Sequence, residues 1–325
     1  MLIKIYDGNA TNPGDVSWGK ILDLGKVVVY DKCTREQFLE RISDVEIAIT
    51  NKQTWDAEAF DHAPKLKMIA LCSTGYNLVD LEAAAAHGVV VSNAPSYSTP
   101  DVAQHTFALL LELTNHVGDL NRRVQAGDWI HAGDFNFWGE TLIEVADKTF
   151  GIIGMGHIGQ AVAKIARGFG CQVIFADRRP KPELESDGIK QVERDDLFKQ
   201  ADIISLHCAL TEETTGMINE QSLALMKDGV YIINCARGPL IDEKALRAAL
   251  DSGKVRGAGL DVLDHEPMAP DCPLLGAPHC VITPHMAWAT VEARTRLYKI
   301  IAENIEAFLA GHPINVVDPA VLKKS

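Results

Sequence analysis

KTFGIIGMGHIGQAVAKIARGFGCQVIFADRR, residues Lys148–Arg179, is the stretch from which the fold can be predicted. Its apolar run Phe150–Ile153 is typical of a buried parallel strand, and the helical pattern of Gln160–Arg167 ends at glycines. A second apolar run, Gln172–Ala176, is followed directly by Asp177. The order of strand, helix and strand predicts a βαβ unit in a parallel sheet.

A G-x-G-x-x-G motif, GMGHIG, joins the first strand to the helix. Gly154 permits a tight turn, Gly156 lets the backbone approach a pyrophosphate, and Gly159 lets the helix pack closely on the strand. The start of the helix, where His157 and Ile158 contribute their backbone, offers N–H groups and a partial positive charge to phosphates. A glycine-rich turn is the alternative interpretation of such a motif alone. The surrounding strands, helix and terminal acid favour dinucleotide binding.

Asp177 at the end of the second strand indicates which dinucleotide is bound. A carboxylate there accepts hydrogen bonds from a ribose diol and repels a 2′-phosphate, so the sequence predicts NAD, with NADH preferred over NADPH. Arg178 and Arg179 weaken that preference, because either could reach toward a 2′-phosphate.

The bulk properties are those of a globular protein with room for two domains: 325 residues, 47% hydrophobic and 23% charged. A net charge of −13, with no basic block beyond Lys323-Lys324, argues against nucleic acid or anionic membrane as a partner. The sequence contains no apolar run long enough to span a bilayer and no recognisable signal peptide. Seven scattered cysteines without a C-x-x-C predict reduced thiols in a cytoplasmic protein, with no metal site.

Apolar runs alternate with helical patterns through most of the chain, which predicts an α/β fold with parallel sheets. Before the turn-rich segment 93–101, strands are predicted at Leu2–Tyr6, Val27–Tyr30, Glu46–Thr50, Met68–Cys72 and Val89–Ser92, and helices at Thr34–Ile42, Ala57–His62 and Leu78–His87. After the glycine motif, strands are predicted at Asp202–His207, Val230–Asn234, Gly257–Val262 and Val281–Thr283, and helices at Arg194–Lys199, Asn219–Met226, Glu243–Ser252 and Thr290–Leu309.

Between these regions the spacing predicts one long helix over Asp101–Ala126. The segment Asp128–Trp138 follows it and is rich in aromatic residues without helical periodicity. These side chains either pack beneath their own loop or form a subunit interface. We favour the interface, because a protruding aromatic segment has little else to cover it.

Arg237, Glu266 and His285 each follow an apolar strand. The carboxyl ends of parallel strands meet at one edge of the sheet, so all three are expected to face one cleft. Arginine can bind a carboxylate through two parallel hydrogen bonds, histidine can donate a proton to a ketone oxygen, and a neighbouring glutamate favours the protonated imidazole. Taken singly, each residue could be an ordinary loop residue; their shared position downstream of a dinucleotide motif favours a catalytic group.

The chain resembles the D-isomer-specific 2-hydroxyacid dehydrogenases over nearly its whole length. The resemblance rests on five segments in family order: Asn93–Leu113, Gly151–Ala166, Ile233–Leu246, Gly257–Pro267 and Thr283–Thr290. It implies two doubly wound domains, in which a Rossmann NAD-binding domain, residues 100–286, is inserted into a flavodoxin-like substrate domain, residues 1–99 and 287–325. It also implies a homodimer.

The resemblance assigns roles to individual residues. Arg237 becomes the carboxylate clamp, His285 the acid/base and Glu266 its partner. The loop Ser73, Thr74 and Gly75 lines the substrate site, where Trp138 closes the pocket. The cofactor site gains five further residues: Thr106, Cys235, Ala236, Arg237 and Asp261.

Within the family, the phrases VAQHTFALLLEL, DFNFW and AWAT are most similar to the glycerate dehydrogenases, also called hydroxypyruvate reductases. The implied reaction is NADH-dependent reduction of hydroxypyruvate to D-glycerate, with glyoxylate as a second substrate. Tyr76 beside the carboxylate loop leaves D-lactate-type and other 2-oxo acid reductases of the same family open. An NAD(H)-sensing binding protein, or corepressor, is the alternative outside catalysis.

Overall fold

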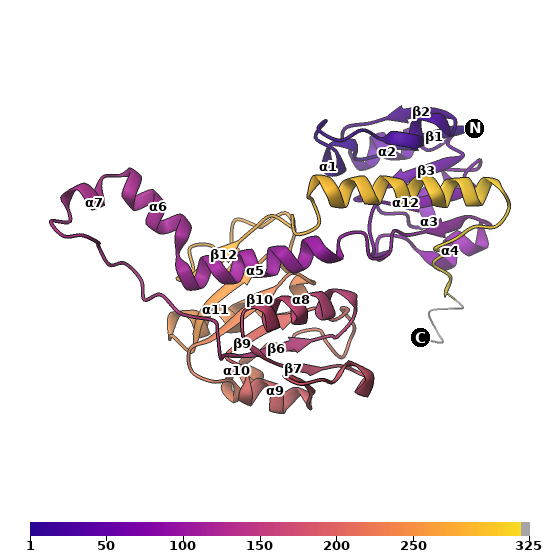
Figure 1. Cartoon of the computed structure of the whole chain (residues 1–325). Helices are drawn as coiled ribbons and strands as arrows, with labels where there is room; N and C mark the ends of the chain where they lie inside the picture. The colour runs from indigo at the N-terminus through magenta and orange to yellow at the C-terminus, as the bar shows by residue number, and fades with distance from the viewer. Residues whose placement is uncertain (320–325) are drawn as a thin grey trace. The chain divides into compact units, whose positions relative to one another are not determined.

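The computed structural model describes residues 1–319 and divides the chain into two compact units. The first contains Met1–Ser98 and the segment that starts at Trp288, and the second is Thr99–Ala287. The chain therefore leaves the first unit, builds the whole second unit, and returns (Figure 1).

The first unit is built on a five-stranded sheet in the order β2-β1-β3-β4-β5, with every neighbouring pair parallel. This is the flavodoxin-like order. Its strands are β1 (Leu2–Ile5), β2 (Lys26–Val29), β3 (Ile47–Thr50), β4 (Met68–Leu71) and β5 (Val90–Ser92). Its helices are α1 (Gly8–Thr11), the 3-10 helix η1 (Gly19–Asp23), α2 (Arg35–Arg41), α3 (Ala57–Asp61), α4 (Leu81–Ala86) and α12 (Val291–Leu309).

Helices cover both faces of this sheet. Phe38 of α2 and Phe60 of α3 pack into the core on one face, and Leu297 and Ile301 of α12 pack into the core on the other. The predicted helix Thr290–Leu309 is confirmed, with the Thr290 hydroxyl accepting the Ala293 N–H as its N-cap. The C-terminal helix thus belongs to the core of the first unit.

The second unit contains a seven-stranded parallel sheet in the order β12-β11-β10-β9-β6-β7-β8. Numbered from β6, this is the Rossmann order with one strand added at an edge. The strands are β6 (Thr149–Ile153), β7 (Gln172–Ala176), β8 (Ile189–Gln191), β9 (Ile203–Leu206), β10 (Val230–Asn234), β11 (Val255–Leu260) and β12 (Cys280–Ile282). The predicted α/β class with parallel sheets is confirmed.

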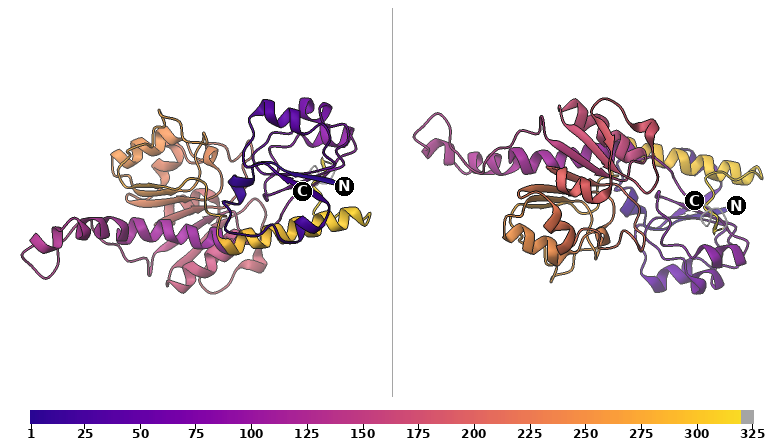
Figure 2. Two further views of the ribbon diagram at one scale, coloured as in Figure 1. Left: turned by 90° about the horizontal axis from the view of Figure 1, so that it is seen from above. Right: turned by 90° about the horizontal axis from the view of Figure 1, so that it is seen from below.

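The helices of the second unit also lie on both faces of their sheet (Figures 1 and 2). Side chains of α5 (Thr99–Asn115) and α8 (His157–Gly168) pack on one face. Side chains of α9 (Arg194–Gln200), α10 (Glu220–Leu225) and α11 (Glu243–Asp251) pack on the other. The remaining helices are α6 (Val117–Gln125), α7 (Asp128–His131), η2 (Pro182–Leu184) and η3 (Gly238–Leu240).

The prediction of one helix over Asp101–Ala126 is wrong, because α5 ends at Asn115 and α6 begins at Val117. The residue between them, His116, has a left-handed backbone with φ of 51°, which an α-helix cannot continue through. The carboxylate of Glu112 accepts the Gly118 N–H at 3.0 and 3.1 Å, so a side chain from α5 caps the start of α6.

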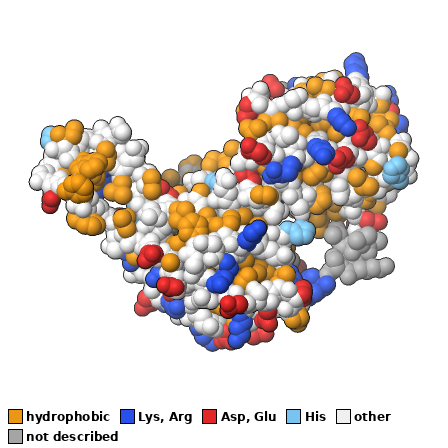
Figure 3. Space-filling view, viewed as in Figure 1, with side chains coloured by type: hydrophobic (Ala, Val, Ile, Leu, Met, Phe, Trp, Pro, Cys, Tyr) orange, Lys and Arg blue, Asp and Glu red, His pale blue; other side chains and the backbone are white. Residues whose placement is uncertain are grey.

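The helices α6 and α7, with the segment to Leu142, form an arm that stands away from the rest of the second unit (Figures 1 and 2). Apolar side chains gather at its end (Figure 3). Ile130, Phe135 and Trp138 are 82%, 87% and 78% exposed. Within one chain these side chains do not pack beneath their own loop.

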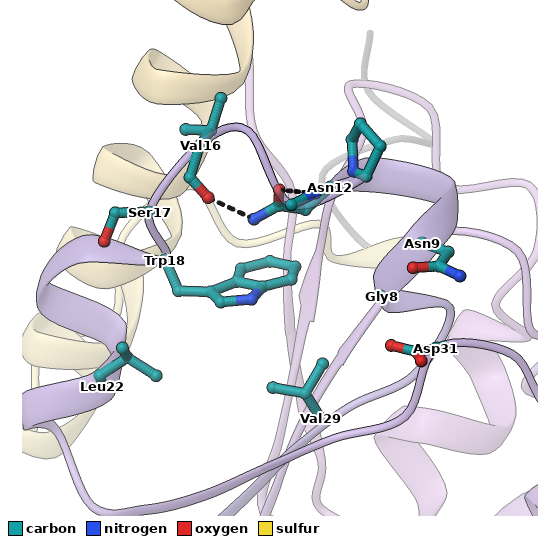
Figure 4. A pocket seen from close by; sticks show the side chains of 11 residues that line it. Gly8, Asn9, Asn12, Val16, Ser17, Trp18, Leu22, Val29 and Asp31 are labelled. Atoms are coloured by element: carbon teal, nitrogen blue, oxygen red, sulfur yellow. Dashed lines mark hydrogen bonds between the residues drawn. The ribbon is translucent and has the colours of Figure 1, made fainter.

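The structure also contains two cavities that lie away from the predicted site residues. One of about 350 Å³ in the first unit is lined by Trp18, whose ring lies across it, and by Asn12, whose amide donates to the Val16 carbonyl (Figure 4). The other, about 480 Å³, lies at the amino-terminal ends of β10 and β11. The predicted site residues line neither cavity.

Candidate active site

The glycine motif forms the turn between β6 and α8, and two of its glycines are required by close approach. Gly154 has φ of +95°, and a Cβ there would lie 2.6 Å from the Cys208 backbone nitrogen. A Cβ at Gly159 would lie 2.2 Å from the Gly154 carbonyl oxygen. A side chain at either position would therefore collide with backbone.

Gly156 differs, because a Cβ there would meet nothing within 4 Å among the described residues. It is also the N-cap of the 12-residue helix α8 and has no side chain with which to cap it. The open space and the helix N-terminus suit an approaching phosphate. The residues of this turn therefore fit the pyrophosphate of a dinucleotide.

Asp177 follows β7 and is tied back to the glycine motif. Its Oδ2 accepts the Met155 N–H at 2.8 Å and lies 2.9 Å from Lys181 Nζ. Burial alone would raise the pKa of Asp177, but the bonds from Lys181 and Met155 outweigh it and hold the pKa below its usual value. The carboxylate is ionised where the ribose is expected. The contribution of Lys181 was not predicted from the sequence.

Arg237, Glu266 and His285 follow β10, β11 and β12, which are neighbours in the sheet. The structure therefore brings the three predicted catalytic residues to one sheet edge. Buried Asn234 at the end of β10 shapes the loop that carries Arg237: its amide donates to the Arg237 carbonyl at 2.8 Å and accepts the Ala236 N–H at 3.0 Å.

His285 and Glu266 contact each other directly, with 2.7 Å between Nδ1 and Oε2. The second glutamate oxygen accepts the Leu263 N–H at 3.1 Å, which fixes the carboxylate. Because an ionised carboxylate only accepts, Nδ1 carries the hydrogen of this bond. Glu266 thus fixes the orientation of the imidazole through Nδ1.

Asp261 anchors the loop that carries His285. Its side chain is 1% exposed, and its oxygens accept the Met286 and Ala287 N–H groups at 2.8 Å and the Thr283 hydroxyl at 2.6 Å. Its carbonyl accepts the His285 N–H at 2.8 Å. The protein thus uses both side-chain oxygens for positioning, and the predicted contact of Asp261 with the cofactor stays a prediction.

His105 completes this network from helix α5. Its Nε2 lies 2.9 Å from Thr283 Oγ1 and 3.4 Å from Asp261 Oδ1. The structure thus gives the His105 imidazole two polar partners, Thr283 and Asp261. Neither Thr283 nor this network could be predicted from local sequence patterns, because Thr283 lies 178 positions from His105 in the chain.

Three further predicted cofactor residues lie in or beside this unit's core. Thr106 is fully buried and donates to the Val102 carbonyl of its own helix. Cys235 is adjacent to Thr106, and burial raises the pKa of its thiol to about 12, which keeps it protonated at neutral pH. Ala236 is partly exposed in the loop after β10. None of these side chains supplies an ionised catalytic group.

The predicted substrate loop lies at the carboxyl end of β4 in the first unit. The Ser73 hydroxyl donates to the Gly75 carbonyl at 2.6 Å, and the Thr74 hydroxyl donates to the Ala94 carbonyl at 2.9 Å. The Asn93 amide donates to the Thr74 carbonyl at 2.7 Å. These bonds fix the shape of the loop. Tyr76 packs against the neighbouring core.

Trp138 lies on the arm, which within one chain stands away from the rest of the second unit (Figures 1 and 2). His207 follows β9 beside Gly154, and burial lowers its pKa to about 3, so it is neutral. Within residues 1–319, no group of three or more metal-binding side chains is arranged to hold an ion, and no helix is long and apolar enough to cross a membrane.

Comparison with known proteins identifies the family. Residues 107–287 match the family model "D-isomer specific 2-hydroxyacid dehydrogenase, NAD binding domain". A hydroxypyruvate reductase of Blautia hydrogenotrophica is 46% identical, with 98% of this chain and 100% of that protein covered. A glyoxylate reductase of Korarchaeum cryptofilum is 38% identical, with 89% and 88% covered.

Among solved structures, an acyclic imino acid reductase in complex with NADPH and D-Arg is 35% identical with a TM-score of 0.83, covering 98% of this chain and 100% of that one. The family match confirms a nicotinamide dinucleotide site in the second unit, where the glycine motif lies. From its sequence, its two parallel sheets and these relatives, the chain belongs to the D-isomer-specific 2-hydroxyacid dehydrogenases.

Proposed function

We propose that the protein is an NADH-dependent reductase that converts hydroxypyruvate to D-glycerate, with glyoxylate as a second substrate. The main support for the proposal is the 2.7 Å contact between His285 and Glu266, which follow β12 and β11 of the sheet that also carries the dinucleotide turn. The relative at 46% identity bears the name hydroxypyruvate reductase, and its match covers nearly the whole chain, which supports this substrate.

Each residue has a stated role in the reaction. Arg237 binds the substrate carboxylate through parallel hydrogen bonds. His285 Nε2 gives its proton to the C2 oxygen as that oxygen gains negative charge. Glu266 stabilises the imidazolium before the transfer and keeps the ring oriented after it. The bound reduced nicotinamide supplies the hydride that C2 receives.

The first unit carries the predicted substrate loop, Ser73–Gly75, and the second carries the dinucleotide turn and the acid/base pair. Asp177, ionised at the end of β7, favours the ribose diol of NADH over the 2′-phosphate of NADPH. The proposed location is the cytoplasm, whose reducing conditions suit the seven free cysteines.

The proposed assembly is a homodimer formed through the arm. Its exposed apolar side chains, Ile130, Phe135 and Trp138, match the composition of an interface core, and a second copy would cover them. In that dimer Trp138 closes the substrate pocket of the second copy. The paired substitution Ile130→Glu with Phe135→Glu is expected to yield monomers in sedimentation velocity. An unchanged dimer would remove the arm from the interface.

Steady-state kinetics test the proposed reaction. Loss of reduced-nicotinamide absorbance is followed with hydroxypyruvate, glyoxylate, pyruvate and a branched 2-oxo acid. We expect kcat/KM with NADH to be at least about ten-fold higher for hydroxypyruvate than for pyruvate, because the pocket would hydrogen-bond the extra hydroxyl. A preference for pyruvate or the branched acid would discard the substrate and keep the reaction. Tight NADH binding without turnover would favour the sensing protein.

A further inference from the structure

Lys181 places a positive charge beside Asp177, the residue predicted to distinguish NADH from NADPH. Its Nζ lies 2.9 Å from Asp177 Oδ2 and donates to the Met155 carbonyl at 3.0 Å. Met155 is the residue between the first two glycines of the motif, and its N–H donates to the same Asp177 oxygen. Lys181 therefore contacts both the dinucleotide turn and Asp177, the acid predicted to bind the ribose.

The position of Lys181 is fixed by its backbone as well as its side chain. The Gln191 side chain on β8 accepts the Lys181 N–H at 2.7 Å and donates to the Arg179 carbonyl at 3.0 Å. The Lys181 and Asp177 side chains are 26% and 16% exposed. An ion pair this sheltered is screened less by solvent than a surface pair. Lys181 is thus a built component of the site.

The Lys181–Asp177 ion pair weakens the electrostatic preference for NADH. A lone carboxylate at the end of β7 would repel a 2′-phosphate, but an ammonium group 2.9 Å away cancels most of that field. The lowered pKa of Asp177 reflects the same contact. Lysine also binds phosphate as a point charge. A 2′-phosphate arriving here would meet a cation already in place.

The geometry points to Lys181 as the residue that sets cofactor specificity, by neutralising Asp177 and giving the 2′-phosphate of NADPH a direct partner. The enzyme then accepts NADPH as a second cofactor, with a preference for NADH narrower than Asp177 alone would impose. This inference rests on the dinucleotide site of the proposed function and deepens it.

The test compares Lys181→Met with a matched control. Lys199→Met removes another lysine that pairs with an aspartate, Asp196, at 3.4 Å on exposed α9. We expect Lys181→Met to lower kcat/KM for NADPH at least about ten-fold, the size of one lost charge-assisted hydrogen bond, and to change it less than about three-fold for NADH. Lys199→Met should leave both unchanged.

Lys181→Arg keeps the charge and should retain at least about a third of the NADPH activity, which separates a charge effect from a folding defect. An equal loss with both cofactors, or no loss with either, would overturn the inference.

Calorimetry with adenosine 2′,5′-bisphosphate and with ADP measures nucleotide binding in the absence of a 2-oxo acid. It therefore tests the role of Lys181 without relying on the proposed substrate. Lys181→Met should raise the Kd for the 2′-phosphorylated ligand at least about ten-fold more than the Kd for ADP. That result would stand even if hydroxypyruvate were not turned over, so failure of the proposed substrate and failure of this inference are distinguishable. Equal weakening of the two nucleotides, or binding of neither to the wild type, would contradict the role of Lys181.

Discussion

His285 Nδ1 lies 2.7 Å from Glu266 Oε2, and the other Glu266 oxygen is held by the Leu263 N–H at 3.1 Å. The carboxylate is thus fixed before it orients the imidazole. Because this bond uses Nδ1, the proposed reaction assigns proton transfer to the opposite ring nitrogen, Nε2. This is the relation expected between a general acid and the group that positions it.

Replacing Glu266 by Gln removes the charge and keeps the size of the side chain. We expect kcat for the 2-oxo acid to fall about 10- to 100-fold, because the imidazolium loses its partner, while the Kd for NADH changes less than about three-fold. Stopped-flow turnover and NADH fluorescence titration measure the two quantities. Glu213→Gln, at an exposed loop position, is the control. An unchanged kcat would remove Glu266 from catalysis.

Replacing His285 tests the acid itself. His285 has a left-handed backbone with φ of 55°, which asparagine tolerates better than alanine, so His285→Asn is the better variant. We expect kcat to fall about 10²- to 10⁴-fold with NADH affinity nearly unchanged. If turnover and NADH affinity fell together, His285 would have a structural role.

Replacing Arg237 should act on substrate binding. Arg237→Ala is expected to raise KM for the 2-oxo acid about 10- to 100-fold, the cost of a lost charge-assisted contact, and Arg237→Lys should raise it less because one point charge remains. Initial rates at saturating NADH give the values. A KM equal to that of the wild type in both variants would exclude the clamp role.

The glycines of the dinucleotide turn can be tested against a glycine of the same helix. Gly159→Ala puts a Cβ 2.2 Å from the Gly154 carbonyl, so we expect a lower Tm and weaker NADH binding. At Gly168, also in α8, a Cβ meets nothing within 4 Å among residues 1–319. Gly168→Ala should leave NADH binding intact and not lower the Tm. Similar behaviour of the two variants would contradict the close-packing argument.

Asp261 makes stability depend on pH. Burial favours its neutral form, but hydrogen bonds from His105, Thr283 and two backbone N–H groups outweigh burial and hold its pKa below the usual value. The ionised group therefore stabilises the fold above the unfolded-state pKa of about 3.9, and this stability is lost as the pH falls through the folded-state pKa.

We expect Asp261→Asn to lower the free energy of unfolding by about 1–3 kcal/mol at neutral pH, and by less in acid. Urea unfolding at both pH values measures the difference between variant and wild type. A difference that grew as the pH fell would contradict the assigned direction of the pKa shift.

Local sequence patterns were sufficient for features that depend on neighbouring residues. The parallel strands and the turn at the glycine motif follow from residues close together in the chain. The helix predicted from Leu78 begins instead at Leu81, because the Asp80 side chain accepts the Ala83 N–H and caps it there.

Features that depend on distant contacts could not be predicted in this way. The break at His116 depends on a left-handed residue that propensity does not single out. The Asp261 network joins α5 to the loop after β12. The loop that carries Lys181 is held by Gln191 of β8, which lies ten positions further along the chain. Each requires the tertiary structure to bring the partners together.

The most direct test of the central claim is the configuration of the glycerate formed from hydroxypyruvate and NADH. The reaction is run to completion and the product is resolved by chiral chromatography, with His285→Asn as the background. We expect D-glycerate, formed in step with NADH oxidation and nearly absent in the variant. Formation of L-glycerate, or NADH oxidation that persists at the wild-type rate in His285→Asn, would contradict it.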